Sequence, residues 1–184
     1  MTDQRKIEEA ISSIIVAIGD DPDREGLVGT PVRIAQMYAE FFSGLECDPS
    51  DALATDFETS HDELVILRDI PFFSICEHHF LPFHGVAHIG YIPNGRVAGA
   101  SKLARALDIL ALRPQLQERL TSEVVDAIYS RVRPKGVAAV LSAEPLCISL
   151  RGVKKPGSKI VPCASRGSFR TQSKTKREFL DLLR

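Results

Sequence analysis

The sequence contains no tryptophan and few other large aromatic residues, with 3 Tyr and 9 Phe among 184 residues. It has no excess of charge of either sign, since 23 Lys and Arg residues face 24 Asp and Glu residues and the net charge is -1. General nucleic-acid binding requires a basic surface, so this balance argues against a nucleic-acid partner. Any anion site must therefore be built locally, from a few well-placed Arg and Lys residues.

The sequence also lacks long hydrophobic runs, since none approaches the roughly 20 residues of a membrane span. The N-terminus is amphipathic and charged rather than a signal peptide, which predicts a cytoplasmic protein with no membrane partner. Cysteine is scarce, and in a reducing compartment we expect ligands or buried thiols rather than disulfides at its four positions. These are Cys47, Cys76, Cys147 and Cys163.

What is present is typical of one globular domain: 44% apolar and 26% charged residues, without an internal repeat or a low-complexity tract. Hydrophobic periodicity predicts a first helix whose apolar face carries Ile7, Ile11, Ile14 and Ile18. A second helix is predicted from Thr30, with Pro31 at its first position, to about residue 44. Residues 45–61 are acidic and irregular, and we expect a surface loop there.

From residue 63 the pattern alternates between strands and helices. Strands are predicted at residues 64–70, 85–92, 137–141, 147–153 and 159–163. Two central helices are predicted, one capped by Ser101 and one over residues 115–131, and a short helix at 175–183. This order favours an α+β fold, with a mostly antiparallel sheet and the two central helices on one face.

The segment Cys76-Glu77-His78-His79 carries the strongest chemical signal. The spacing of Cys76 and His79 lets one turn of backbone offer a thiolate and an imidazole to one zinc ion. A third ligand from a distant cysteine would leave one position open, as in catalytic zinc sites, and this indicates a zinc hydrolase. Spacing alone does not choose between Cys147 and Cys163. A buried imidazole that only packs is the competing interpretation, although packing does not need so many adjacent polar side chains.

Two further groups of residues suggest a nucleotide. Ser101, Lys102 and Arg105 follow Gly99 at a helix start, where free N–H groups and cationic side chains suit phosphate. On a second helix, the amide and carboxylate of Gln117 and Glu118 suit the N–H edge of a purine. Taken alone, the Ser101 group is equally typical of a solvated first helical turn. The Gln117 and Glu118 pair, and the isolated cations Arg33 and Arg151, are more typical of solvated surface.

Together these pieces closely resemble the GTP cyclohydrolase I family. The resemblance rests on CEHHFLPFHGVAHIGYIPNGRVAGASKLAR, RPQLQERLTSEVVDAI and CISLRGVKKPGS, and extends from GTPVRIAQMYAEFFSGL to KTKREFL, which is roughly residues 27 to 183. It implies the tunnelling fold (T-fold), in which subunit sheets join into a barrel, and a toroidal homodecamer with active sites between subunits. It divides the chain into an N-terminal helical segment and loop, 1–62, and a catalytic T-fold domain, 63–184.

The resemblance also implies a reaction and a set of roles. The family hydrolyses GTP at guanine C8 to 7,8-dihydroneopterin triphosphate and formate, the first step of folate and pterin biosynthesis. By position, the zinc ligands would be Cys76, His79 and Cys147, and the catalytic acid/base would be His78. Glu118, with Gln117 beside it, would anchor guanine. The groups around ribose and triphosphate would be Ser101, Lys102, Arg105, Arg33 and Arg151.

One position departs from the family pattern. The family usually carries a second histidine two residues before the third zinc ligand, and this chain has Pro145 there. Proline transfers no proton, so three outcomes are open. The full reaction would use another carrier, for which His84 and Glu144 are candidates. A truncated reaction would stop at a ring-opened formamidopyrimidine nucleotide. An altered reaction would act on a related purine nucleotide.

Two other classes of function compete with these enzymes. A nitrile reductase of the same superfamily uses a cysteine nucleophile and lacks the zinc cluster, so the CEHH segment argues against it. A non-catalytic, zinc-binding oligomer would retain the nucleotide site and bind GTP without releasing formate.

Overall fold

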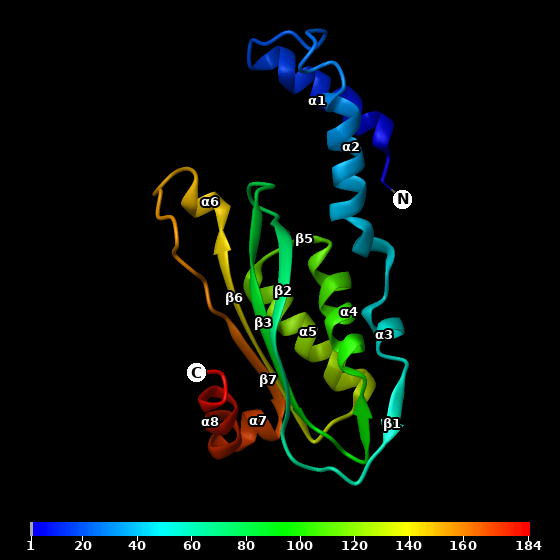
Figure 1. The fold of residues 1–184 in the computed structure, drawn as a ribbon, viewed down its shortest axis with the longest axis vertical. Helices are drawn as coiled ribbons and strands as arrows, with labels where there is room; N and C mark the ends of the chain where they lie inside the picture. Colours follow the sequence, from blue (N-terminus) through cyan, green and yellow to red (C-terminus); the bar gives the residue numbers. More distant parts are fainter. Residues whose placement is uncertain (1) are drawn as a thin grey trace.

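The computed structural model describes residues 2–184, which form a curled sheet with helices on both faces and a helical hairpin projecting from one end (Figure 1). The main sheet has five strands in the order β5-β2-β3-β6-β7. Their bounds are β5 Pro114–Gln115, β2 Val65–Cys76, β3 Pro82–Ile92, β6 Gly136–Pro145 and β7 Cys163–Gly167. Every pairing is antiparallel except the short β2–β5 contact.

The two central helices, α4 (Ala100–Ala111) and α5 (Gln117–Val132), pack on one face of this sheet and form the main core with it. Residues on β6 alternate between faces, as a strand requires. Val137, Ala139 and Leu141 face the helices, while Ala138 and Val140 face the other way. The mixed α+β architecture expected from the sequence is confirmed, and so is the placement of two helices on one face.

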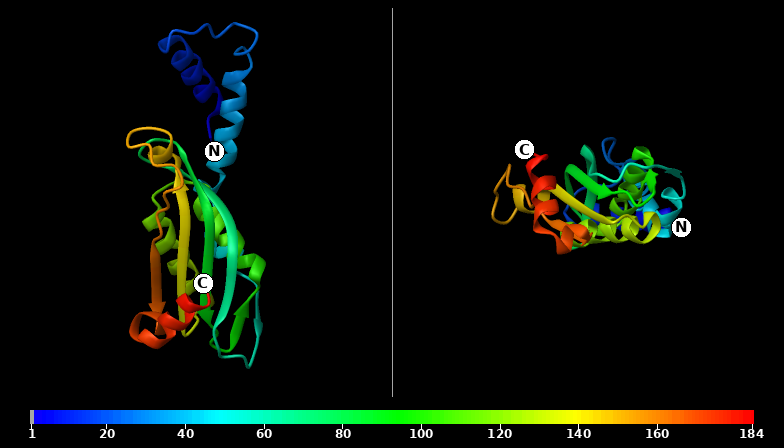
Figure 2. Two further views of the ribbon diagram at one scale, coloured as in Figure 1. Left: turned by 60° about the vertical axis from the view of Figure 1, so that its left-hand side comes forward. Right: turned by 90° about the horizontal axis from the view of Figure 1, so that it is seen from below.

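The opposite face of the sheet is partly covered by the C-terminal helices, which the sequence pattern did not place. These are α7 (Ser168–Thr171) and α8 (Ser173–Asp181), and both lie at the end of the sheet away from the hairpin (Figures 1 and 2). Phe169 and Phe179 are fully buried there against Ala138 and Val140. Their rings meet edge to face, with centroids 5.8 Å apart.

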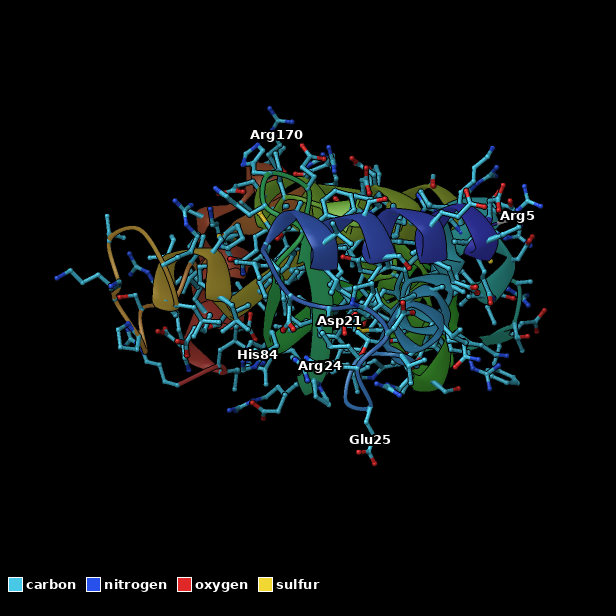
Figure 3. The ribbon with its side chains drawn as sticks, turned by 90° about the horizontal axis from the view of Figure 1, so that it is seen from above. Arg5, Asp21, Arg24, Glu25, His84 and Arg170 are labelled. Atoms are coloured by element: carbon cyan, nitrogen blue, oxygen red, sulfur yellow. The ribbon has the colours of Figure 1, made fainter. Side chains whose placement is uncertain are left out.

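The N-terminal hairpin consists of α1 (Gln4–Ala17) and α2 (Thr30–Phe41) and extends beyond the sheet (Figure 1). The predicted apolar stripe of α1 is only partly covered in one chain. Ile11 is buried, but Ile14 is 53% exposed and Ile18 is 74% exposed. Seen from above, the loop between the helices carries Asp21 and Arg24 (Figure 3). Within residues 2–184, no helix combines the length and apolar character needed to cross a membrane.

The predicted surface loop at 45–61 is more ordered than expected. It contains the end of the 3-10 helix η1 (Ser43–Glu46), the short helix α3 (Pro49–Ala52) and β1 (Asp56–Glu58). β1 pairs with β4 (Arg96–Ala98) in a separate two-stranded sheet, and Arg96 bonds the Asp56 carboxylate at 2.7 Å. The acidic residues that suggested a loop are therefore partly strand residues with a basic partner.

The strand predicted at 147–153 is wrong. Pro145 ends β6 and is followed by the short helix α6 (Leu146–Ser149). Proline has no N–H to donate, so it favours a strand end. The strand predicted at 159–163 also shifts, because Ile160 makes only an isolated bridge and β7 begins at Cys163. Ser101 lies inside α4 and not at its cap, which is Gly99.

The junction between the hairpin and the sheet domain depends on Gly44. Its N–H donates to Leu112 O at 3.0 Å, and the Arg113 guanidinium donates to Gly44 O at 2.8 Å and to Cys47 O at 2.6 Å. A Cβ at Gly44 would lie 2.1 Å from Ile109 O, which is backbone and cannot move aside. The hairpin and the sheet domain are therefore held together by a close backbone contact that only glycine permits at residue 44.

We expect Gly44→Ala to reduce the free energy of unfolding by about 1–3 kcal/mol, because overpacking against fixed backbone must displace α4 or η1. Urea unfolding followed by circular dichroism measures this. Gly26→Ala is the matched control, since its Cβ would meet only the end of the flexible Arg24 side chain. Equal stability of the two variants would show that the junction adapts without cost.

Candidate metal and nucleotide site

A tight turn between β2 and β3 displays the cysteine–histidine segment. Cys76 ends β2, its N–H donates to Leu81 O at 2.9 Å, and Phe80 N–H donates back to Cys76 O at 2.9 Å. Phe80 has φ = 53°, a left-handed conformation that costs a non-glycine residue energy. The bonds across the turn hold it in this shape, so Cys76 is buried while His78 and His79 are exposed.

The register of β3 and β6 brings the third sulfur to this turn. Phe83 of β3 is paired with Pro145 of β6, and Cys147 follows two residues later on α6. The ligand atoms of Cys76, His79 and Cys147 all lie within 4.8 Å of one another, the one group of its kind among residues 2–184.

Cys163 lies elsewhere, exposed on β7 opposite Val140, so the structure resolves geometrically a choice that spacing left open.

The donor chemistry at this point suits a divalent cation. Burial raises the pKa of the Cys147 thiol, and the neighbouring Cys76 sulfur raises it further. Two thiolates this close repel each other unless a cation lies between them. Two sulfurs and one imidazole nitrogen form a ligand set that zinc favours, and three protein ligands leave a fourth position free. The residues present therefore fit the expected metal.

A cavity of about 280 Å³ adjoins the three side chains. This volume is close to the lower end of the roughly 300–1,000 Å³ range of small-molecule sites. Its wall contains the two sulfurs and both histidines, the start of α5, and several apolar residues: Cys76, Cys147, His78, His79, Gln115, Leu116, Gln117, Glu118, Phe83, Pro145, Ile148 and Ile160. Such a mixture suits a flat heterocycle that presents a few polar edge groups.

The first turn of α5 supplies the polar part of this wall. Gln117 is 4% exposed, and its Nε2 donates to Ile160 O at 3.4 Å. Its Oε1 is buried and has no hydrogen-bond partner among the described residues. A buried carbonyl oxygen without a partner costs free energy, so a ligand N–H at this position would be stabilising. Glu118 follows, exposed at the cavity wall, and can accept further N–H groups.

The residues expected around ribose and triphosphate do not join this cavity in one chain. Arg33, Ser101, Lys102, Arg105 and Arg151, all within the described residues, are absent from its lining. The cavity lies where α5 begins. Ser101 is in the first turn of α4, at the opposite end of that helix from its connection to α5 (Figure 1). A helix of 12 residues is about 18 Å long. The Ser101, Lys102 and Arg105 group is therefore separated from the cavity within one chain.

Arg33 and Arg151 also lie away from the cavity lining. Arg33 lies on the projecting helix α2, where its guanidinium donates to Thr30 Oγ1 at 2.9 Å. Arg151 is exposed on the loop that follows α6 and carries other cations. Of these two, only Arg151 comes from a segment that continues from the cavity wall, through Ile148.

The structure also shows where Pro145 and the two candidate proton carriers, Glu144 and His84, lie. Pro145 is buried and lines the cavity. Glu144 accepts hydrogen bonds from Ser149 Oγ at 2.5 Å and Gly157 N–H at 2.9 Å, and these bonds lower its pKa. His84 pairs with Glu144 across the strands and is exposed on the side of the sheet away from α5 (Figure 3). Neither side chain, both being described, lines the cavity.

Three described residues beside the turn received no role from the sequence. Glu77, Gln115 and Arg119 form a hydrogen-bonded group between the turn and α5. Their signal in the sequence was present but ambiguous, because Glu77 interrupts the ligand segment and Arg119 directly follows Gln117 and Glu118.

This arrangement defines a class of protein, an α+β domain in which a cysteine–histidine group that could hold a metal ion opens to a cavity of about 280 Å³. The GTP cyclohydrolase I family model matches residues 7–184, and the chain belongs to that family.

Curated relatives match along nearly the whole chain. The GTP cyclohydrolase 1 of Thermobifida fusca is 55% identical over 98% of this chain and 88% of its own length. Those of Dehalococcoides mccartyi strain BAV1 and Thermoanaerobacter pseudethanolicus are 53% and 54% identical, each over 100% of this chain and 98% of their own. A solved structure, an archaeosine synthase QueF-Like in the apo form, aligns with 56% of this chain and 93% of its own at a TM-score of 0.45 and 21% identity, a likeness too weak to support an argument.

We expect Cys147→Ala to abolish tight zinc retention, because it removes one of three ligands. Zinc content after gel filtration, measured by atomic emission, tests this, with Cys163→Ala as a control that should keep its metal. Protons compete for the same thiols, and the raised pKa of Cys147 strengthens that competition. Zinc affinity should therefore rise with pH. A Cys147→Ala protein with one full equivalent of zinc would contradict the ligand assignment.

Proposed function

We propose that this protein is a zinc-dependent GTP cyclohydrolase I, which hydrolyses GTP at guanine C8 and releases formate and 7,8-dihydroneopterin triphosphate. One observation carries the proposal in a chain of this family: the Cys76–His79–Cys147 group and the start of α5 share one cavity. The same cavity thus offers a place for a metal ion and polar groups for a purine edge.

In the proposed site, Cys76, His79 and Cys147 hold zinc, which supplies Lewis-acid activation of water at neutral pH. Glu118 accepts N–H groups of the guanine edge, and Gln117 Oε1 gains the partner that it lacks among residues 2–184. The two together orient the imidazole ring of the base toward the metal end of the cavity. This orientation would require the turn between β2 and β3 to keep a fixed separation from α5.

His78 is the proposed acid/base. It lines the cavity beside His79, with the two ring centroids 6.3 Å apart. Imidazole both accepts and donates protons near neutral pH, so His78 would protonate a purine ring nitrogen during C8 attack and later assist loss of formate. Because His78 is exposed and adjacent to a ligand, it needs no movement of the turn to reach a bound base.

We further propose that the active site is completed by other copies of this chain, as a homodecamer of T-fold subunits whose sheets join into a barrel. The division of the cationic residues supports this. The triphosphate would extend from the cavity toward the Ser101, Lys102 and Arg105 group of a partner subunit, with Arg33 and Arg151 also contributing. The exposed Ile14 and Ile18 on α1 provide apolar surface for assembly.

The proposed organisation keeps two parts in the chain. Residues 1–62 form the helical segment and its connection, and residues 63–184 form the catalytic T-fold domain. We place the enzyme in the cytoplasm, because a site built on two thiols requires reduced cysteines. All four cysteines of the chain are free thiols.

Pro145 keeps the truncated and altered reactions open as alternatives to the complete one, although the relatives favour neither of them. A protein that only binds the nucleotide is the remaining alternative.

Incubation of zinc-loaded protein with GTP should release formate and form the pterin chromophore in equal amounts. Formate measured by a coupled dehydrogenase assay and the pterin measured by fluorescence after oxidation test this. His78→Gln should retain zinc and reduce formate release by about 100-fold or more, the usual scale for a lost acid/base. Arg170→Gln is a control at an exposed position on α7.

Each alternative gives a different result. A GTP-derived product that keeps its formyl group would replace the complete reaction by the truncated one. Turnover of another purine nucleotide in preference to GTP would favour the altered reaction. GTP binding without any ring-opened product would indicate a non-catalytic nucleotide-binding protein.

A further inference from the structure

Arg119, on the first turn of α5, makes hydrogen bonds in three directions. Its Nη2 donates to Glu77 Oε2 at 2.5 Å and to Pro114 O at 2.8 Å, and its Nε donates to Gln115 Oε1 at 2.9 Å. These partners lie on the turn between β2 and β3, which carries the candidate metal ligands Cys76 and His79, and on β5. One guanidinium therefore joins the turn that carries three of the proposed site residues to the segment that leads into α5.

Gln115 anchors this group to the core. It is 1% exposed, and its Nε2 donates to Leu110 O at 3.0 Å and to Glu123 Oε2 at 2.8 Å. Its backbone carbonyl accepts the Glu77 N–H at 3.1 Å. Both amide atoms of Gln115 thus have partners, so its orientation is fixed from the α4 end and from α5 together.

The position of Glu77 connects this network to the candidate metal ligands. Glu77 lies between Cys76 and His78, yet its carboxylate is not part of the group of ligand atoms and is turned toward Arg119. On the other side, Arg119 directly follows Gln117 and Glu118, which line the cavity. The network therefore spans the distance between the two halves of the proposed chemistry, the metal ligands and the purine-binding wall.

If the Arg119–Glu77 pair had only a structural role, its loss would change stability little. The side chains of Arg119 and Glu77 are 40% and 31% exposed, and a partly exposed ion pair contributes about 0–1 kcal/mol to stability. The geometry is more specific than that of a simple ion pair, because three acceptors surround the planar guanidinium of Arg119. Arginine satisfies such an arrangement, and lysine does not.

We propose that Arg119 and Glu77 are positioning residues: they fix the Cys76–Leu81 turn against the start of α5 and so set where the metal stands relative to the bound purine. This inference rests on the proposed function for its purine half, while its metal half stands independently. Partners of this kind, which hold a ligand segment and do not touch the metal, commonly change metal affinity about 10–100-fold when removed.

The test measures zinc affinity by chelator competition on the folded, full-length protein, alongside thermal unfolding. Arg119→Gln, Arg119→Lys and Glu77→Gln should each weaken zinc binding by about tenfold. The double variant of Glu77→Gln and Arg119→Gln should lose no more than either single one, because both remove the same contact. Asp126→Asn is the matched control, since Asp126 lies on the same helix as Arg119 but pairs with Arg166 of β7, remote from the turn.

Turnover supplies a second readout. The variants should lower kcat for formate release more than they raise KM for GTP, because the turn and the purine wall would still exist but out of register. Arg119→Lys with wild-type zinc affinity would overturn the role of the fork. Lower thermal stability with unchanged zinc affinity in all three variants would reduce the network to a structural one. Weakened zinc binding in a protein whose wild type releases no formate would support the network and reject the proposed function.

Discussion

The close approach of two cysteine sulfurs from distant parts of the sequence is the constraint on which the site depends. Cys76 and Cys147 are 71 positions apart in the chain, and the pairing of β3 with β6 brings them together. A shift of one residue in that register would turn Pro145 and the chain beyond it to the other face of the sheet. The buried residues of β6 that face α4 and α5 prevent this shift, so the hydrophobic core also fixes the relative positions of the candidate ligands.

Much of this was predictable from local patterns, because the residues concerned act within one turn or one helix. The central helices follow from Leu103, Leu107 and Leu110 on one and Leu120, Val124 and Ile128 on the other. The Cys76–His79 pair needs only a turn. Cys147 could not be chosen over Cys163 in this way, since that choice is made by strand register over a long sequence separation. The helix at Cys147 was missed because the apolar Cys-Ile-Ser-Leu run reads as a strand until Pro145 is recognised as its end.

The cationic residues illustrate a different limit. Sequence similarity groups Arg33, Ser101 and Arg151 as if they met in one place, but the fold keeps them on α2, on α4 and on the loop after α6. Spacing along a chain carries no information about contacts with another copy of it. The orphaned Gln117 Oε1 and the exposed apolar residues of α1 are the signs within one chain that its surroundings are incomplete. The Arg119 network shows the reverse case, a connection complete within the chain that spacing did not reveal.

Pro145 decides how protons can move in this cavity. Among the described residues of its wall, the imidazoles are His78 and His79, and His79 is assigned to the metal. Glu144 is held by Ser149 and Gly157 on the far side of the strand, and its lowered pKa keeps it ionised and hydrogen-bonded. A reaction that needs a second proton carrier must therefore draw it from solvent or from a partner subunit. In the proposed mechanism the first hydrolytic attack needs one acid beside the metal ligands, and His78 in the cavity wall is the candidate for it within a single chain.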